Sequence, residues 1–424
     1  MNEAAAKQLL DKLYRQQASK LTTSLAAYFK LTSLELAEDI VQDTFEAALQ
    51  HWGKTTIPQD PLAWLYQVCR NKALNKLSGQ SKTTTVGTVS ATQSQLPPEL
   101  FLEHELPESR LRLLFSLCHP KLSPKAQLLL ILRYICNLKT EEIGTAMVMG
   151  TEAVLKMLQR SRQVLQQEQQ PVLVPSLAKS KSYLPQVLTA IYLLYNEGYK
   201  SSSGDALLRQ ELCQEAIKLL HSLLHLPVLA TPAAHALMAL LLLNTSRFQA
   251  RTGAQGDIVE LEEQDRKLWD RTLIALGFQH LSIARAGTEI SRFHLEAAIA
   301  ATHSRAESVA ATDWQTIILL YERLYQLQPS PFTALNKAVA IFYQHGPQAC
   351  LDHLAKLPQL HWLQQYYLYQ ALLGKVYMAL GQPGKATEHY QQALVLAKNK
   401  MEQQYLHKKI AALKPPAPAP ALPA

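Results

Sequence analysis

The amino-acid sequence predicts an all-α protein, and three observations support this fold class. Apolar residues make up 48% of the chain while only 15 residues are glycine, and Ala, Leu, Gln and Lys are abundant. Apolar residues recur every three or four positions over long stretches, as they do on one face of a helix. Runs of alternating β-branched residues, which would indicate strands, are few. Because 424 residues exceed one ordinary hydrophobic core, we expect two or three domains.

The first domain is expected over residues 1–77. Residues 3–31 read as one or two amphipathic helices whose leucines pack beneath the next helix, LELAEDIVQDTFEAAL. The apolar residues of that next helix recur at helical spacing and predict a packed face: Leu36, Ile40, Val41, Phe45, Ala48 and Leu49. The polar residues are expected on the opposite side: Glu38, Asp39, Gln42, Asp43 and Glu46. The simplest interpretation of such an acidic face is solvation, and the alternative is a binding surface.

A second helix is predicted over PLAWLYQVCRNKALNKL, with Pro61 at its first turn. Trp64 and Tyr66 precede Arg70, Lys72 and Lys76, and no acidic residue lies between them. Aromatic rings beside cations suit unstacked bases and phosphates. The competing interpretation places the two rings in the core.

The stretch 78–106 is expected to be a flexible linker because its Ser, Thr, Gln and Gly residues offer little to bury. Residues 107–166 then predict a helical module that ends in a helix-turn-helix. We expect Thr140 to cap its first helix, residues 148–150 to turn the chain, and Thr151 to cap its second helix. Ile143 stands where a glutamate would complete a capping box from Thr140, so the cap is predicted to be simple. Lys156, Arg160 and Arg162 are expected within reach of one side of the second helix, which could then enter a major groove.

The remaining chain is predicted to be helical again. A linker over 167–182 leads into a domain over 183–413, and the Pro-rich residues 414–424 are expected to form a disordered tail. LYQLQPSPFTALNKAVAIFYQHG and LLGKVYMALGQPGKATEHYQQALVLA have small residues where helices would cross and a proline after a helix. This layout predicts stacked helical hairpins of the TPR kind, with a concave surface suited to a peptide or partner domain.

The order of these modules resembles the sigma-70 family, and specifically the extracytoplasmic-function (ECF) group of RNA polymerase sigma factors. AEDIVQDTFEAAL followed by PLAWLYQVCRNKALNKL resembles region 2, and LSPKAQLLLILRYICNLKTEEIGTAMVMGTEAVLKMLQRSRQVL resembles region 4. The C-terminal half resembles the extension of an ECF subgroup that carries a TPR-like domain. The resemblance implies a factor that binds core RNA polymerase, recognises the −10 and −35 promoter elements, assists DNA melting, and is regulated in cis by its C-terminal domain.

The resemblance also implies a role for individual residues. Asp39, Gln42 and Asp43 fall where the family contacts core polymerase. The expected contacts to the −10 element are Trp64, Arg70, Asn71, Lys72 and Asn75. The expected contacts to the −35 element are Thr151, Glu152, Lys156 and Arg160.

Other polar patterns in the C-terminal half each have a simpler, structural interpretation. A possible regulatory corner that the family shares is formed by Asn196, Glu197, Gly198, Tyr199 and Arg209. It could hold a ligand, but a structural turn with Gly198 at positive φ is the favoured interpretation. His221 and His225 have metal-binding spacing but no evident third ligand, so neither a metal site nor a cofactor is expected.

The five cysteines are far apart and without a CxxC pair, which predicts reduced core thiols. No signal-like or membrane-spanning stretch is evident, so we expect a cytoplasmic protein that makes no membrane contact. Nothing resembles a nucleophile with its base or a phosphate-binding loop, so the chain is not expected to be an enzyme. The alternative to a sigma factor is a TPR-like interaction scaffold without promoter activity, which burial of both Trp64 and Arg70 would favour.

Overall fold

The computed structural model describes residues 3–28, 34–54, 56–77, 111, 114–167, 177–202, 208–253, 257–357 and 363–413. Helices form almost all of the regular structure there, and these ranges contain no β-strand, which confirms the all-α prediction. The predicted linker over 78–106 and the predicted tail over 414–424 lie outside the described residues. The chain divides into one unit of residues 1–194 and 218–229 and a second unit of residues 195–217 and 230–424.

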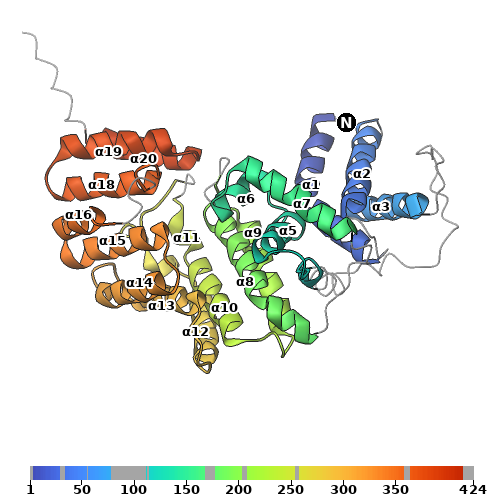
Figure 1. The fold of residues 1–424 in the computed structure, drawn as a ribbon. Coiled ribbons are helices and arrows are strands. Elements are labelled where there is room, and N and C mark those ends of the chain that lie inside the picture. The colour runs from blue at the N-terminus through green and yellow to red at the C-terminus, as the bar shows by residue number, and fades with distance from the viewer. Residues whose placement is uncertain are drawn as a thin grey trace, which may run out of the picture. The chain divides into compact units, whose positions relative to one another are not determined.

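The first unit begins with three helices, α1 (Glu3–Tyr28), α2 (Leu34–Lys54) and α3 (Pro61–Leu77), and each contacts the other two (Figure 1). Residues 3–28 form one helix rather than two. The buried face of α2 is largely the predicted one, since Ile40, Val41 and Phe45 are buried, but Leu49 is exposed.

The described residues of this unit also form α5 (Pro124–Tyr134), α6 (Thr140–Met147) and α7 (Thr151–Gln167). All three contact one another. Ser123 caps α5, because its side chain accepts a hydrogen bond from the backbone N–H of Ala126, and Pro124 occupies the first helical position. Buried leucines and isoleucines from residue 129 to 132 make α5 the central helix of this module.

The division between the units falls within α8 (Leu177–Tyr199) and within α9 (Gln210–Leu224). Residues 177–182, which the sequence predicts as part of a linker, belong to α8. Among its described residues, the second unit also contains α10 (Pro232–Thr245), α11 (Phe248–Arg251), α12 (Arg271–Ala284), α13 (Arg292–Arg305), α14 (Trp314–Leu327), α15 (Pro331–His345), α16 (Pro347–Leu354), α18 (Tyr367–Ala379), α19 (Pro383–Leu396), α20 (Lys400–Ala412) and the 3₁₀ helix η2 (Arg266–Leu268).

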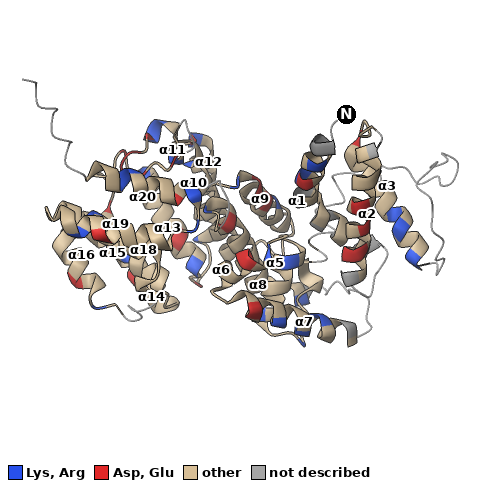
Figure 2. Ribbon diagram, turned by 90° about the horizontal axis from the view of Figure 1, so that it is seen from above, with Lys and Arg blue, Asp and Glu red and all other residues tan. Residues whose placement is uncertain are grey.

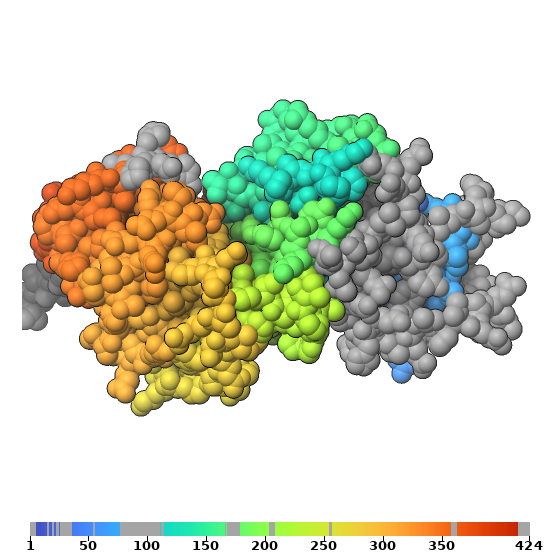
Figure 3. All heavy atoms as spheres, turned by 60° about the horizontal axis from the view of Figure 1, so that its bottom comes forward, coloured from blue at the N-terminus to red at the C-terminus, as the bar shows by residue number. Residues whose placement is uncertain are grey.

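Consecutive helices of the second unit pack on one another from α12 to α20. The side chains of α14 to α16, in orange, form a continuous face of this unit in Figure 3. Small residues do lie at the helix crossings: a Cβ on Gly374 would come within 2.8 Å of the Tyr390 ring, so only glycine lets α18 and α19 approach this closely. Pro331 and Pro383 follow the ends of α14 and α18, as the layout predicts, and each begins the next helix, where its missing N–H costs nothing.

Candidate nucleic-acid interface

The acidic side of α2 is accessible to a partner. Asp39 and Gln42 are exposed, and Gln42 donates a hydrogen bond from Nε2 to Glu46 Oε1 at 3.2 Å. Asp43 is half-exposed and pairs with Lys76 of α3 at 3.3 Å. Asp39, Gln42 and Asp43 are three and four positions apart and therefore share one helix face, and the ion pair of Asp43 with Lys76 links that face to α3. Figure 2 shows the acidic residues of α2 in red.

Glu38 does not belong to this face, contrary to the sequence prediction. Its Oε1 atom lies 3.6 Å from Arg133 Nη2 in α5, and its Oε2 atom accepts a hydrogen bond from Arg162 Nη2 in α7 at 3.2 Å. The acidic residues of α2 are thus divided between an outward face and a contact with the helix-turn-helix module. Sequence spacing alone cannot distinguish the two, because both sets are polar.

Asp60 and Pro61 set the start of α3. The Asp60 Oδ1 atom accepts hydrogen bonds from the backbone N–H groups of Leu62 and Ala63, both at 3.0 Å. A carboxylate at this position satisfies N–H groups that a helix leaves without intrahelical partners. Pro61 at the first helical position confirms the predicted boundary.

The helix α3 buries a narrow stripe of Leu65, Cys69 and Ala73. Trp64, Asn71 and Asn75, which are seven and four positions apart, share a different side. Trp64 and Asn71 are half-exposed and Asn75 is exposed. The sequence therefore brings one aromatic ring and two amides to a common accessible stripe.

The cations of α3 do not form the single face that the sequence suggests. Residues two apart on a helix point in different directions, so Arg70 and Lys72 flank the stripe of Trp64 and Asn75 from opposite sides. Both cations are half-exposed. A strand lying along this stripe could meet a positive charge on either side (Figure 2, blue on α3).

Trp64 rests on aromatic neighbours rather than standing free. Its ring is stacked with the His51 ring, with centroids 5.7 Å apart and planes at 7°, and it meets the Trp52 ring edge-on at 5.4 Å. Trp52 is buried and Trp64 is half-exposed. This support holds the indole in place and leaves part of it accessible, which suits a base-stacking platform.

The helix-turn-helix differs from the prediction at both caps. Thr140 is the first residue of α6 rather than its cap, and the backbone N–H of Lys139 donates to Glu142 Oε2 at 2.8 Å. A capping box from Thr140 would need a glutamate at position 143. The box instead begins at Lys139, and Glu142, three residues later, supplies the carboxylate. Thr151 is likewise the first residue of α7 rather than its cap.

The turn between α6 and α7 is tight and strained. Val148 has a φ of 53° in the left-handed region, which is costly for a β-branched residue. A Cβ on Gly144 would lie 2.9 Å from the carbonyl oxygen of Met149, so this position accepts glycine alone without a shift of the backbone. The predicted turn over residues 148–150 is present, and its geometry depends on both positions.

The α7 residues predicted to read the −35 element are all exposed: Thr151, Glu152, Lys156 and Arg160. Glu152 and Lys156 form an ion pair at 2.6 Å along the helix. Arg162 points elsewhere, contrary to the sequence prediction, because its Nε donates to the Tyr134 hydroxyl at 2.6 Å and its Nη2 donates to Glu38. Burial raises the pKa of Tyr134 to about 12, so its hydroxyl stays neutral and can accept this bond. The basic side of α7 therefore consists of Lys156 and Arg160 without Arg162.

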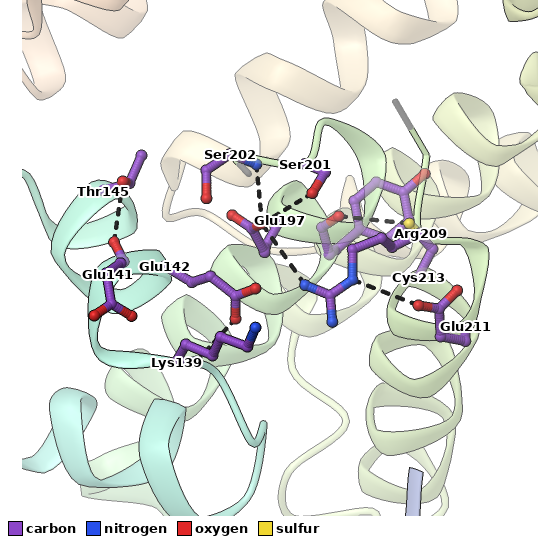
Figure 4. A network of polar contacts seen from close by, with 11 residues as sticks. Lys139, Glu141, Glu142, Thr145, Glu197, Ser201, Ser202, Arg209, Glu211 and Cys213 are labelled. Atoms are coloured by element: carbon purple, nitrogen blue, oxygen red, sulfur yellow. Dashed lines mark hydrogen bonds and ion pairs between the residues drawn. The ribbon is translucent and has the colours of Figure 1, made fainter. Parts of the chain in front are cut away.

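The predicted regulatory corner is a polar network at the end of α8 (Figure 4). The buried Glu197 carboxylate accepts a hydrogen bond from the backbone N–H of Ser202 at 3.0 Å and lies 3.9 Å from Arg209 Nη1. Arg209 also pairs with Glu211 at 3.5 Å. Asn196 and Tyr199 are half-buried in the last turn of the same helix. The structure thus brings the predicted corner residues together.

Gly198 serves close packing and not a turn. It lies within α8 and does not have a positive φ. A Cβ there would come within 2.7 Å of Cys213 Sγ and 2.8 Å of the Arg209 carbonyl oxygen. The expected turn glycine is therefore wrong, and the physical reason for glycine is the approach of the chain at Arg209 and Cys213 to the helix backbone.

Arg251 is a member of this corner that the sequence analysis missed. Its guanidinium lies over the Tyr199 ring, 3.7 Å from the centroid, and its Nη1 donates to the Tyr199 carbonyl oxygen at 2.8 Å. No sequence motif connects the two positions, which are 52 residues apart. Only the tertiary fold brings them into contact.

The histidine pair and the cysteines show no cluster of metal ligands. The rings of His221 and His225 meet edge-on at 4.4 Å, and within the described ranges no group of three or more His, Cys, Asp or Glu residues is placed to hold a metal ion. All five cysteines are free and buried, as predicted for core thiols. Burial raises the pKa of the Cys69 thiol to about 12, so it is a poor nucleophile.

Among the described residues, no helix is both long enough and apolar enough to cross a bilayer.

Comparisons with known proteins match two segments of the chain to family models. Residues 13–83 match the model of sigma-70 region 2, and residues 183–285 match a family of unknown function (DUF6596). An uncharacterized protein (R00370) of Rhizobium meliloti (strain 1021) is 36% identical over 389 residues, which cover 90% of each chain. An ECF RNA polymerase sigma factor, SigG, of Mycobacterium tuberculosis is 29% identical over 200 residues, which cover 41% of this chain and 53% of SigG. No solved structure matches.

The region 2 match spans most of α1, all of α2 and all of α3, which are the helices that carry the acidic face and the aromatic stripe. The similarity to the R. meliloti protein extends over both units. Residues 13–83 are therefore a sigma-70 region 2 segment, which supports the sigma-70 family, and the chain belongs to one family with the R. meliloti protein over nearly its whole length.

Proposed function

We propose that the protein is an ECF-type sigma factor that binds core RNA polymerase through α2 and promoter DNA through α3 and α7. The observation that carries the proposal is the pairing, in a segment matched as sigma-70 region 2, of an exposed acidic face with an accessible aromatic stripe that two cations flank. Asp39, Gln42 and Asp43 would contact the polymerase. The contacts to the −10 element would come from Trp64, Arg70, Asn71, Lys72 and Asn75.

The proposed mechanism needs no covalent chemistry by the protein. An unstacked base can lie against an aromatic ring, and nearby cations can neutralise the adjoining phosphates. Trp64, supported by His51, would hold a base of the opened strand, while Arg70 and Lys72 would hold the backbone on either side. Lys156 and Arg160 of α7 would bind the −35 element in the major groove, with Thr151 and Glu152 near the start of the helix.

We further propose that the TPR-like helices of the C-terminal half regulate the factor in cis, in the cytoplasm, with a protein or peptide partner on their concave face. The successive packing of α12 to α20 supports the helical-repeat part of this proposal. The corner around Glu197 and Arg209 would hold the end of α8 against the start of α9 and would not bind a ligand, because its charges are already paired. The scaffold alternative is less well supported, since Trp64 and Arg70 are both half-exposed.

Run-off transcription with purified core polymerase tests the proposal. At least one of two forms, the full-length protein or the protein truncated after Gln170, should direct transcription from a cognate promoter. That promoter is first selected from genomic fragments. The proposal is refuted if neither form binds core polymerase at low salt. A truncation that leaves output unchanged would refute only the regulatory part.

A further inference from the structure

An acidic segment of the second unit occupies a cluster of lysines. The segment, residues 257–263, has the sequence DIVELEE and lies between α11 and η2. We call it the acidic strap. Apart from one bridge between Thr252 and Ile258 it forms neither helix nor strand. Its backbone is held at its start, where Gly253 N–H donates to the Asp257 carbonyl oxygen at 2.9 Å and Val259 N–H donates to that of Arg251 at 3.0 Å.

The lysines come from two helices that follow more than a hundred residues later. Asp257 pairs with Lys408 of α20 at 2.8 Å. Glu260 pairs with Lys375 of α18 at 3.0 Å and also contacts Lys409 of α20. We call Lys375, Lys408 and Lys409 the lysine cluster.

Glu260 is the central carboxylate of the strap. Besides its two lysines, it accepts a hydrogen bond from the Tyr405 hydroxyl at 2.8 Å. Burial by itself would raise the pKa of Glu260, but the charge of Lys375 and the hydrogen bonds from Lys409, Lys375 and Tyr405 outweigh it and lower the pKa to about 2. The cluster is therefore well suited to a carboxylate, which stays ionised there.

The next two strap residues show how the site distinguishes side chains. Glu262 pairs with the same Lys375 at 2.9 Å, and the Lys375 ammonium also donates to the Tyr343 hydroxyl at 3.0 Å. Leu261, between the two glutamates, packs instead against the apolar cluster that includes Trp314 and Ile341. The segment turns here, because the Glu263 N–H donates to the Glu260 carbonyl oxygen at 2.9 Å. The surface thus receives an acidic, an apolar and an acidic side chain in succession from one turn.

The strap contacts α18 and α20 through its side chains. The exposure of these side chains ranges from 15% for Glu260 to 63% for Lys408. The apolar clusters that hold α18 and α20, around Val376 and Leu406, contain no strap residue. The exposed pair of Asp257 with Lys408 contributes little and is weakened by salt, whereas the less exposed Glu260 makes the stronger attachment.

We propose that the lysine cluster, with Tyr343 and Tyr405, is a binding site for a short acidic peptide of a partner protein, and that the acidic strap is its internal, displaceable occupant. The inference goes beyond promoter recognition and does not depend on it. An internal occupant competes at an effective concentration on the order of millimolar. A partner must therefore bind better than the strap, or the strap must first be weakened.

Fluorescence anisotropy with a labelled peptide tests this proposal on the full-length protein. The probe is fluorescein-labelled DIVELEEQ, the sequence of residues 257–264. A variant with Asp257→Asn, Glu260→Gln and Glu262→Gln should bind the probe at least about tenfold more tightly than the unmodified protein, because the internal competitor is weakened. Adding Lys408→Ala and Lys409→Ala should abolish that gain, whereas Lys398→Ala, at an exposed lysine between α19 and α20, should preserve it.

Several outcomes would overturn the proposal. One is a strap variant with an unchanged circular dichroism spectrum that binds the probe no better than the unmodified protein. Another is equal binding of a probe whose glutamates are glutamines, and a third is tighter binding of a single-stranded oligonucleotide of equal charge, which would indicate a nucleic-acid site. If the strap variant fails to fold, the unmodified protein provides the test. Excess peptide should increase amide hydrogen exchange over residues 257–263, and unchanged exchange would refute displacement.

Discussion

The carboxylate of Glu38 in α2 lies 3.2 Å from the guanidinium of Arg162 in α7, so the helix with the acidic face is tied to the second helix of the helix-turn-helix. The side chains are 28% and 29% exposed, respectively. Arg162 is held in place by the Tyr134 hydroxyl as well. This ion pair separates Glu38 from the residues proposed to contact polymerase, and Arg162 from those proposed to contact DNA.

A double-mutant cycle should detect the tie between Glu38 and Arg162. Combining Glu38→Gln with Arg162→Met should show a coupling of about 0.5 kcal/mol in the free energy of unfolding, since partly exposed ion pairs contribute little. Urea unfolding at low and high salt measures it, and the coupling should shrink at high salt. A coupling of zero at low salt would mean that the pair does not form in solution.

Loss of the acidic face should weaken polymerase binding. Asp39→Asn with Gln42→Ala removes two exposed side chains of α2 without opening its core, and we expect the affinity for core polymerase to fall by about tenfold. Biolayer interferometry with immobilised core enzyme measures this change. Glu307→Gln, at an exposed glutamate after α13, is the control and should bind normally. Equal affinities for the α2 variant and the control would exclude this face.

The two cations that flank Trp64 should act on strand opening. Arg70→Ala with Lys72→Ala should reduce permanganate reactivity of the −10 region. The slope of log affinity against log salt concentration should also decrease by about one to two, because each cation is proposed to contact phosphate on its own side of the stripe. Lys12→Ala in α1, also an exposed cation, should change neither measurement. Normal melting by the double variant would contradict the proposed role of α3.

Two substitutions in the turn between α6 and α7 should act in opposite directions. Val148→Gly should stabilise the protein by about 1 kcal/mol, because it relieves a left-handed backbone at a side chain that is 58% exposed. Gly144→Ala should destabilise it by about 1–3 kcal/mol, because the new Cβ would crowd the Met149 carbonyl oxygen. Thermal unfolding followed by circular dichroism compares the two. A loss of stability in the Val148 variant would show that the strain is not present.

The second unit should lose stability in mild acid because of His303. Burial, with the charges of Arg247 and Arg266, lowers the pKa of His303 to about 3 from an ordinary value of 6.5. The unfolded chain therefore binds a proton below pH 6.5 that the folded chain accepts only near pH 3, and stability falls between these values.

The size of this effect can be checked with a variant. Between pH 6.5 and pH 5 the cost should be on the order of 1–2 kcal/mol, and His303→Phe should remove most of that slope. Urea unfolding at both pH values measures the difference. An identical slope in the variant would assign the acid sensitivity to other groups.

The sequence by itself determined the helical class, the starts of several helices and the identity of the N-terminal domain. These features depend on local chemistry: the period of apolar residues places Ile40 and Val41 in the core, and Asp60 with Pro61 begins α3 wherever the helix packs. The five buried thiols were likewise predictable, because no spacing suggests a metal site or a disulfide.

Only the tertiary structure decided which polar residues remain available to a partner. Glu38 and Asp39 are adjacent acids, yet one is paired with Arg162 and the other is exposed. Gly198 indicates a turn in the sequence but accommodates Cys213 in the fold. The lysines that contact the acidic strap lie more than a hundred residues after it in the sequence. Hydrophobic periodicity is a local property of a helix, whereas the partner of a charge depends on which distant element is packed beside it.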